Sequence, residues 1–595
     1  MAEAAIEERQ LLKSLHWYDG FVIALCNPGF LIASLGFTLA TVGALGSVIL
    51  WGISAFVGLL QNWIYSETAA MFPDKPGGIS LYAHEGWRSR FNLFGPIAAF
   101  GYWIGWSVVL ALFGNLIGSL VVAEWFSGQS DKVYYSTPAG DSPFGLAQVI
   151  GIGVVFAVWL FNVFGVKPSL AVGYVTGALL MIPLVILIVF PYFTGDWHSS
   201  NITYENVADA PFSLFQLSLM WLFLMCWSAY GIEVCASFAP EYHDTKRDTA
   251  LALRTAAVFS LLVYTLLPLG LGGVVGTAGD SGAYYVTAFK EIVGNTLGSI
   301  AIISLLASLV LSMNSATADG GRALYGIEVC ASFAPEYHDT KRDTAMALRT
   351  AAVFSLLVYT LLPLGLGGVV GTAGDSGAYY VTAFKEIVGN TLGSIAIISL
   401  LASLVLSMNS ATADGGRALY GIARDDMTIK WLYHLNRFHV PARGMTVDLI
   451  VNTGFILLMG ANNLAILYLS NIGYVFAHVL ALSGFLLLRR DRPNWPRPIK
   501  VGPAWLPIAG LLALFNLVLV IYGVTQQNLA AYVGFYEFTG FPFFVGVGIL
   551  LLSVLLFFYR RAVQDRAKIT FRDRDVPVMP TTEQMELLQE ESVPG

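Results

Sequence analysis

Residues 20–41 read GFVIALCNPGFLIASLGFTLAT, an apolar run with Asn27-Pro28-Gly29-Phe30 near its middle. A helix of about 20 apolar residues is long enough to cross the hydrocarbon core of a bilayer. Proline removes a backbone donor and clashes with the preceding turn, and glycine tolerates unusual dihedrals. Backbone groups freed at this depth are tolerated where they line a cavity or meet buried protein. The stretch predicts a transmembrane helix that is either broken at a cavity or kinked at a packed proline.

Similar apolar runs recur along the whole chain. Of its 595 residues, 56% are hydrophobic and 12% are charged, whereas roughly 25% are charged in ordinary soluble proteins. This composition predicts an all-α polytopic membrane protein with a basic plan of 12 transmembrane helices, or about 14 with a repeated hairpin. The predicted spans are about 20–41, 46–70, 95–122, 145–165, 170–192, 213–237, 253–276, 297–318, 348–371, 392–413, 447–465, 467–487, 503–524 and 541–559.

The loops predict one orientation. The first twenty residues lack the charged n-region and cleavage site of a signal peptide. Lys and Arg follow the second, sixth, tenth and last spans of the basic plan and precede the ninth, whereas the loops between them are nearly free of both. The positive-inside rule then places both termini in the cytoplasm of a multi-pass protein, which we expect in the plasma membrane. The predicted segments are 1–19 (cytoplasmic), 20–324 (spans one to eight), 325–419 (extra spans), 420–560 (spans nine to twelve) and 561–595 (a loose cytoplasmic tail).

A block of 95 residues occurs twice: residues 230–324 recur as 325–419, and the one difference is Leu251 against Met346. Copies this similar indicate a recent tandem duplication or an assembly error rather than an ancient structural repeat. The block adds two spans and therefore preserves the orientation of everything after it. We predict that the segment from Tyr325 to Arg342 is a cytoplasmic connection.

The sixth span contains Trp227-Ser228-Ala229-Tyr230-Gly231-Ile232-Glu233. Burying a carboxylate in the membrane costs roughly 2.5–3.5 kcal/mol, so such a residue usually faces a partner or an aqueous path. Glu233 is interpreted as a proton carrier, as a counter-ion for an ammonium group, or as a packing carboxyl that stays protonated. Interrupted spans one and six lie five spans apart, which is typical of two inverted five-helix repeats around a central site. Half-helix ends there can face a carboxylate and an amine.

Several motifs resemble the amino acid–polyamine–organocation (APC) family of permeases. They are Glu67 to Pro73 with Gly77, Gly78 and Tyr82, then Gly101 with Gly105-Trp106, Trp227 to Glu233, Pro240 to Asp248, and Gly416 to Asp425. The resemblance implies a LeuT-like 5+5 inverted-repeat bundle and secondary active transport of an amino acid or amine. In this sequence Asn-Pro-Gly-Phe replaces the family's usual small-residue run in span one, which puts the geometry of carboxylate capture in question.

The resemblance also implies a substrate site and a coupling residue. The substrate would meet the backbone at Asn27, Pro28, Gly29 and Phe30 and at Trp227, Ser228, Ala229, Tyr230 and Gly231. Glu233 matches a position that serves proton coupling in similar arginine exchangers. Ser315 and Thr317 in span eight form a candidate ion site, but hydroxyls in membrane helices more often bond their own backbone. The sequence leaves proton or sodium coupling, symport or exchange, and the oligomeric state open.

Two other classes compete with a transporter. The first is a substrate sensor, or a permease inactivated by the duplication, because two identical hairpins compete for one place in the core. The second is a membrane enzyme, but we find no nucleophile–base constellation or P-loop. The four cysteines lack metal-ligand spacing, no basic patch indicates nucleic acid, and we expect neither a cofactor nor a metal.

Overall fold

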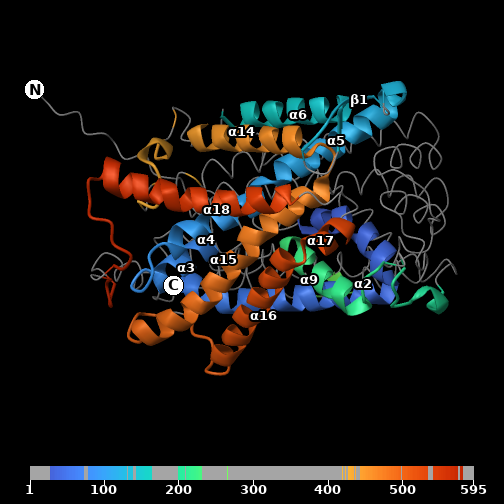
Figure 1. Ribbon diagram of the computed structural model, residues 1–595. Coiled ribbons are helices and arrows are strands. Elements are labelled where there is room, and N and C mark those ends of the chain that lie inside the picture. Colours follow the sequence, from blue (N-terminus) through green and yellow to red (C-terminus); the bar gives the residue numbers. More distant parts are fainter. Residues whose placement is uncertain are drawn as a thin grey trace, which may run out of the picture.

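The computed structural model describes a bundle of long helices (Figure 1). The described residues are 27–72, 78–129, 132–138, 142–163, 198–207, 210–230, 261, 264–265, 419, 423, 426–434, 436, 442–497, 499–533, 540–573 and 576–580. Their α-helices are α2 (Asn27–Met71), α3 (Gly78–Trp87), α4 (Phe94–Ser107), α5 (Val109–Trp125), α6 (Leu146–Val163), α9 (Leu214–Tyr230), α14 (Ala442–Met459), α15 (Asn463–Asp491), α16 (Trp505–Thr525), α17 (Gln527–Val533) and α18 (Phe541–Tyr559).

The described part of the chain holds 6 helical segments that are long and apolar enough to cross a membrane. They are Phe37–Thr68, Phe94–Ser119, Ala442–Met459, Asn463–Asp491, Trp505–Thr525 and Phe541–Gln564. Two shorter apolar helices, Leu146–Leu160 and Leu214–Tyr230, accompany them. Each of these segments overlaps expected spans, but Phe37–Thr68 covers parts of the first two, and Ala442–Met459 begins and ends several residues before the expected 447–465. The remaining expected spans, including both copies of the repeated hairpin, lie outside the described residues.

The first two predicted spans form one helix, which is interrupted only at Gly43. We expected separate helices over 20–41 and 46–70, but α2 runs through both, and only Gly43 departs from helical geometry, with φ 74° and ψ 178°. A left-handed φ of this kind favours glycine because it lacks Cβ. A Cβ at this position would also lie 2.6 Å from the carbonyl oxygen of Thr203. The segment around Thr203 closes the break, since Leu45 N donates to Thr203 O at 2.9 Å.

Helix α15 crosses the middle of the bundle and packs on α3, α4, α9, α16 and α18 (Figure 1). Glycines bring its backbone close to α4 and α3. A Cβ at Gly473 would lie 2.6 Å from Gly101 Cα, and one at Gly86 would lie 2.4 Å from Gly484 Cα. Small residues allow membrane helices to approach closely enough for extensive van der Waals contact. These crossings fix α15 against the two helices that follow α2.

We expect Gly473→Val to destabilise the protein, because its side chain would displace the backbone of α4 at Gly101. Overpacking of this kind costs about 1–3 kcal/mol. The measurement is the thermal unfolding midpoint of the full chain in lipid nanodiscs. Gly548→Val in α18 is the matched control, since nothing lies within 4 Å of a Cβ there. Equal midpoints for both variants would contradict the tight crossing.

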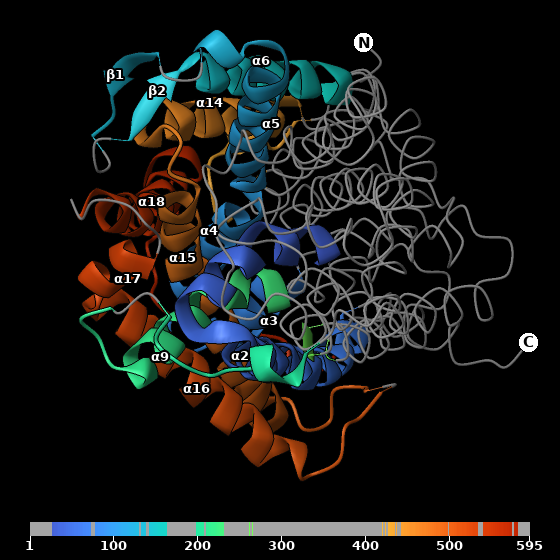
Figure 2. The same ribbon diagram turned by 90° about the vertical axis from the view of Figure 1, so that its right-hand side faces the viewer.

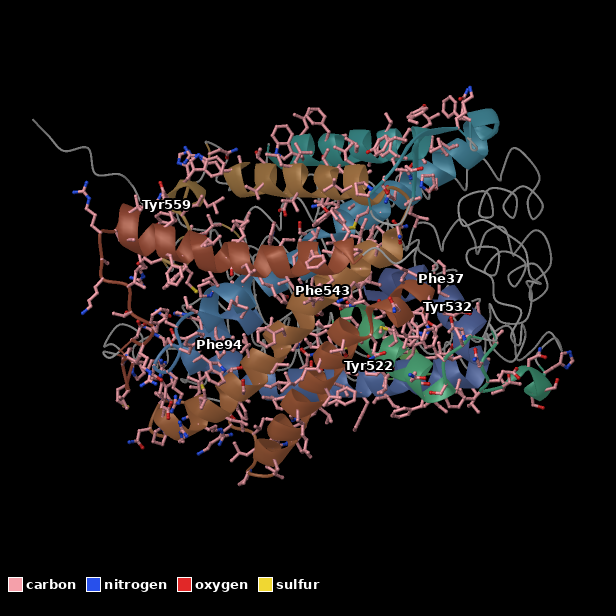
Figure 3. All side chains as sticks on the ribbon, viewed as in Figure 1. Phe37, Phe94, Tyr522, Tyr532, Phe543 and Tyr559 are labelled. Carbon is pink, nitrogen blue, oxygen red and sulfur yellow. The ribbon has the colours of Figure 1, made fainter. Side chains whose placement is uncertain are left out.

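The outer helices α16 and α18 turn large apolar side chains outward. Leu511 is 66% exposed, Phe544 71% and Leu555 63%. Figure 3 labels Phe543 and Tyr559 towards the two ends of α18, and side chains project from that helix along its length. This exposed apolar surface indicates contact with lipid or another protein. With the length of these helices, it supports the prediction of membrane-crossing segments.

Basic loops that are far apart in the sequence meet at one end of the bundle. Arg90, before α4, pairs with Asp491 at the end of α15. Arg88 pairs with Asp573 at 3.0 Å, and Lys430 pairs with Asp565 at 2.7 Å. Burial acts to raise the pKa of the Asp565 carboxyl, but hydrogen bonds from Lys430 and Arg560 outweigh it and hold that pKa below its ordinary value. The carboxyl therefore stays ionised at neutral pH.

The segment after α18 is bound to the bundle through residue 573, so the expectation of a loose tail is wrong for this part. The Phe571 ring stacks on Phe91 with centroids 6.3 Å apart, and Phe571 O accepts a hydrogen bond from Asn92 N at 2.8 Å. Asp573 N in turn donates to Arg88 O at 2.9 Å. Residues 581–595 lie outside the described part.

The opposite end of the bundle carries a two-stranded antiparallel hairpin, β1 (Val133–Ser136) and β2 (Pro143–Gly145), beside α6 and α14 (Figure 2). Its register pairs Val133 with Gly145 and Ser136 with Pro143, with an irregularity between Val133 and Tyr135. Ala461, in the turn before α15, donates its N–H to Pro143 O at 3.3 Å. The hairpin, which lies between α5 and α6, therefore contacts the turn between α14 and α15.

Candidate functional site

The last turn of α9 places Trp227, Ser228, Ala229 and Tyr230 in the core of the bundle, each at most 3% exposed. The helix is apolar around its whole circumference, which is typical of a buried helix. It packs on α2, α15, α16 and α17. Four of the nine residues predicted to meet the substrate therefore lie together in one buried turn.

The other predicted site residues are not placed with them. Asn27, Pro28, Gly29 and Phe30 form the first turn of α2, with helical backbone, and the side chains of this turn are not among those described. Gly231, Glu233, Ser315 and Thr317 lie outside the described residues, as does the segment from Tyr325 to Arg342. Their roles remain predictions.

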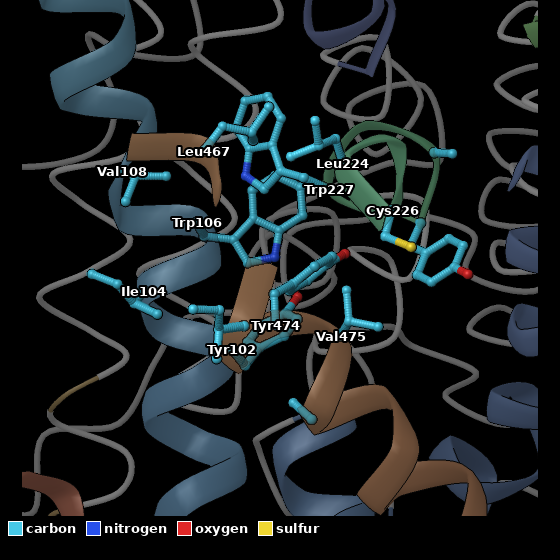
Figure 4. Close-up of a cluster of buried hydrophobic side chains, with 14 of the residues drawn as sticks. Tyr102, Ile104, Trp106, Val108, Leu224, Cys226, Trp227, Leu467, Tyr474 and Val475 are labelled. Atoms are coloured by element: carbon cyan, nitrogen blue, oxygen red, sulfur yellow. The ribbon is translucent and has the colours of Figure 1, made fainter. Parts of the chain in front are cut away.

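Trp227 links α9 to α4. Its indole Nε1 donates to Gly105 O at 2.6 Å, and Gly105 lies against the ring of Tyr474 from α15. A Cβ at Gly105 would come within 2.7 Å of that ring. Figure 4 shows Trp227, Trp106 and Tyr474 close together between the three helices. The indole therefore lies at the point where α4, α9 and α15 meet.

Tyr230 lies beside a histidine that the sequence analysis did not select. The Tyr230 hydroxyl donates to Asn516 Oδ1 at 2.8 Å, and its ring centroid lies 5.2 Å from that of His478. His478 is fully buried, and its Nδ1 lies 2.9 Å from the Tyr65 hydroxyl. Tyr474 covers another side of the imidazole at 4.9 Å. Its one signal in the sequence is a lone histidine within an apolar span, and that signal does not separate a functional residue from a core residue.

Side chains from other helices bond backbone carbonyls of α9. Asn471 Nδ2 donates to Leu224 O at 3.1 Å, and the Tyr264 hydroxyl donates to Ser228 O. Tyr264 also packs on Trp51 with ring centroids 4.9 Å apart. These hydrogen bonds tie α9 to the residues packed around it.

A second polar cluster surrounds Glu67, the first residue of a motif noted in the sequence. Its Oε1 accepts a hydrogen bond from Arg497 Nε at 3.1 Å, and its Oε2 accepts one from Val501 N at 2.8 Å. Arg489 pairs with the same carboxylate. Trp495 Nε1 donates to Met71 O at 2.9 Å. The motif thus ties the end of α2 to the segment between α15 and α16.

Glu85 extends this cluster to α3. It pairs with Arg492 at 2.6 Å and with Arg88 at 3.0 Å. The Arg492 guanidinium also lies over the Trp495 ring, 4.9 Å from its centroid. Buried charges are stable only when they are paired and hydrogen-bonded, and both carboxylates meet this condition. The cluster holds α2, α3 and α15 together and is separate from the last turn of α9.

The described residues contain no group of three His, Cys, Asp or Glu side chains that could hold a metal ion. Cys226 is buried, and its thiol donates to Leu222 O at 3.1 Å. This cysteine behaves as the small buried hydrophobe expected from its place in an apolar span.

Comparison with known proteins identifies the family. A sequence model described as amino acid permease matches residues 20–325 and 322–549, which is most of the chain. The chain belongs to this family of the APC group, as its motifs indicated. It is an integral multi-pass membrane protein of a transporter family rather than an enzyme. The two matched segments meet where the second copy of the repeated block begins.

Individual relatives are distant. The chain is 23% identical over 237 residues to the aspartate-proton symporter of Bacillus subtilis, covering 38% of this chain and 41% of that protein. It is 24% identical over 275 residues to the serine/threonine exchanger SteT of the same species, covering 44% and 56%. It is 22% identical over 223 residues to the D-serine/D-alanine/glycine transporter of Escherichia coli O6:H1, covering 35% and 47%. The chain thus spans about half the length of these relatives.

Proposed function

We propose that this protein is a secondary active transporter that moves an amino acid or a related amine across the membrane by alternating access. The observation that carries the proposal is the buried cluster around Trp227 and Tyr230, where α9 meets α4, α15 and α16. Family membership supports it, and so do the three relatives, whose names all describe amino acid transport or exchange.

The proposed architecture is a LeuT-like bundle of two inverted five-helix repeats with both termini in the cytoplasm. In it, the backbone at Asn27 to Phe30 binds the substrate carboxylate. The backbone from Trp227 to Gly231 binds the amine, and the aromatic side chains around His478 lie beside that segment. The meeting of the basic loops at one end of the bundle supports the orientation, because the positive-inside rule places such loops together in the cytoplasm.

Uptake into proteoliposomes of the full chain tests the proposal. The probes are a radiolabelled panel of amino acids and amines, with and without an imposed pH gradient and with sodium present or absent. We expect saturable uptake of one substrate class. Binding without uptake would favour the sensor. In that case, deletion of residues 325–419 would show why uptake is absent. Restored uptake would mean that the repeated block inactivates a permease.

Glu233 is the proposed coupling residue, and we expect Glu233→Gln to abolish the dependence of uptake on the pH gradient. The amide keeps the shape of the side chain but cannot carry a proton at neutral pH. Glu328→Gln is the matched control, since Glu328 occupies the corresponding position of the second copy. We expect it to retain the wild-type gradient dependence. Equal losses in the two variants would contradict the different roles given to the copies.

Ser315 and Thr317 provide the alternative coupling site, which would bind sodium. Sodium-dependent uptake that Thr317→Val abolishes would support this alternative. The aspartate-proton symporter among the relatives favours the proton as the coupling ion.

A further inference from the structure

Asp448 is a fully buried carboxyl in α14. Its Oδ1 accepts hydrogen bonds from Trp103 Nε1 at 2.9 Å and from Ser107 Oγ at 2.6 Å. Its Oδ2 is also buried and has no hydrogen-bond partner among the described residues. An ionisable side chain at membrane depth usually marks a proton or ion site rather than a packing contact. Asp448 lies in a segment that is long and apolar enough to cross the membrane.

The described elements around Asp448 bring no cation to it. Arg443 on α14 lies over the Trp431 ring, and Lys430 pairs with Asp565. Helix α6 has no ionisable residue, α4 has only Tyr102, and α5 has only Glu124, near its far end. The titratable groups of α15 are Tyr468, Tyr474, His478, Arg489, Arg490 and Asp491. The first three contact Phe223, Trp106 and Tyr65. The last three lie in the final turn of the helix, where Arg489 pairs with Glu67 and Arg490 pairs with Asp491. An unpaired carboxyl in such surroundings is neutral, because burying its charge costs several kcal/mol.

Asp448 and Asn452, one turn apart on α14, bind the break between α4 and α5. Helix α4 ends at Ser107 and α5 begins at Val109. Asn452 Nδ2 donates to Ser107 Oγ at 3.0 Å, and Asn452 Oδ1 accepts from Ala111 N at 3.2 Å. Asn452 therefore satisfies the backbone N–H of Ala111 after the break, and both Asp448 and Asn452 hold the Ser107 side chain before it.

The same turn of α4 faces the candidate site on its other side. Gly105 O, two residues before Ser107, accepts the hydrogen bond from Trp227 at 2.6 Å. A change at Asp448 therefore reaches Trp227 through one turn of backbone. We propose that Asp448 is a proton-binding positioning residue, whose protonation state sets the position of the turn from Gly105 to Val108 and, through it, of Trp227.

This inference rests on the proposed function for its effect on transport, but not for the proton site itself. In the acid form, Oδ2 carries the proton and Oδ1 accepts both hydrogen bonds. When the proton leaves for water, the carboxylate stays buried without a positive charge beside it and disturbs the break. Stability and uptake are then lost as the pH rises, and a neutral side chain of the same shape prevents this loss.

Asp448→Asn provides the test, with Asn452→Ala as the matched control that weakens the same break without a titrating group. We measure the thermal unfolding midpoint and initial uptake rate of the full chain across neutral to alkaline pH. Above the pKa of an acid, its protonated fraction falls about tenfold for each pH unit. As the pH rises, we expect uptake to fall about tenfold in wild type and in Asn452→Ala, but less than about twofold in Asp448→Asn. The fall in the unfolding midpoint should likewise be smaller in Asp448→Asn. An unchanged pH dependence in Asp448→Asn would overturn the proposal.

Infrared spectroscopy of the wild type covers the case in which Asp448→Asn does not fold. We expect a buried carboxylic-acid C=O band that disappears as the pH rises and changes frequency in Ser107→Ala, which removes one hydrogen bond to Oδ1. A Ser107-sensitive band that persists at every pH would show a permanently protonated structural acid and overturn the proposal. Wild-type protein without uptake would contradict the proposed transport function, whereas the band and the midpoint would still decide the proton site.

Discussion

Glu67→Gln is expected to lower the free energy of unfolding by about 3–5 kcal/mol, the usual cost of removing one partner from a buried ion pair. The Glu67 side chain is fully buried, and those of Arg489 and Arg497 are 14% and 4% exposed. The amide would leave both guanidinium groups without a negative charge and weaken the bond from Val501 N. The measurement is reversible unfolding of the full chain in nanodiscs, by denaturant or heat.

Asp491→Asn is the control for this prediction. It removes a carboxylate that pairs with Arg90, but both side chains of that pair are about one third exposed. Solvent screening limits such a pair to about 0–1 kcal/mol. We also expect Glu67→Gln with Arg489→Gln to cost less than the sum of the two single variants, because the residues contact each other. Similar small losses in Glu67→Gln and Asp491→Asn would contradict the structural role given to Glu67.

Replacing Trp227 is expected to have the largest effect on transport. Trp227→Ala opens a cavity where α4, α9 and α15 meet and leaves the carbonyl oxygen of Gly105 without its donor. We expect the initial uptake rate to fall at least about a hundredfold, as a buried hydrogen bond and aromatic packing are lost together. Trp227→Phe keeps most of the aromatic surface and should fall about tenfold. Substrate binding and the unfolding midpoint, measured on the same samples, separate loss of the site from loss of the fold.

Trp159→Phe is the matched control for Trp227→Phe. The indole of Trp159 also makes one hydrogen bond, to Thr446 Oγ1 at 3.2 Å, but it joins α6 to α14 away from the last turn of α9. We expect its uptake to stay within about twofold of wild type. A loss equal to that in Trp227→Phe would mean that both tryptophans act through general stability.

Hydrophobic length predicted the described spans well, because an apolar run of about 20 residues has few alternatives to crossing a bilayer. Helices α16 and α18 begin and end within about two residues of the runs expected over 503–524 and 541–559. The break at Gly43 escaped prediction. The two apolar runs predict separate helices, whereas the contact that closes the break comes from Thr203, far along the chain.

The sequence singles out the turn from Trp227 to Tyr230 because a helix with glycine and a carboxylate at its centre is uncommon, and its role in substrate binding stays a prediction. The polar groups around it could not. His478 and Asp448 are each surrounded in the sequence by apolar residues. Nothing in the local sequence distinguishes a hydrogen-bonded core residue from a functional one. What identifies them is a set of partners on other helices, such as Tyr65 and Ser107, each more than 300 residues away.

Glu67 and Arg489 are separated by 422 residues, and this separation bears on how the chain is made. Ribosomes add about 5–20 residues per second, so roughly 20–80 s pass between the synthesis of Glu67 and that of Arg489. During that interval α2 must stay in the membrane or at the insertion machinery with its carboxylate unmatched. The repeated 95 residues fall within the same interval and lengthen the delay. Premature release or degradation of nascent chains is therefore a hazard that this one ion pair imposes on biosynthesis.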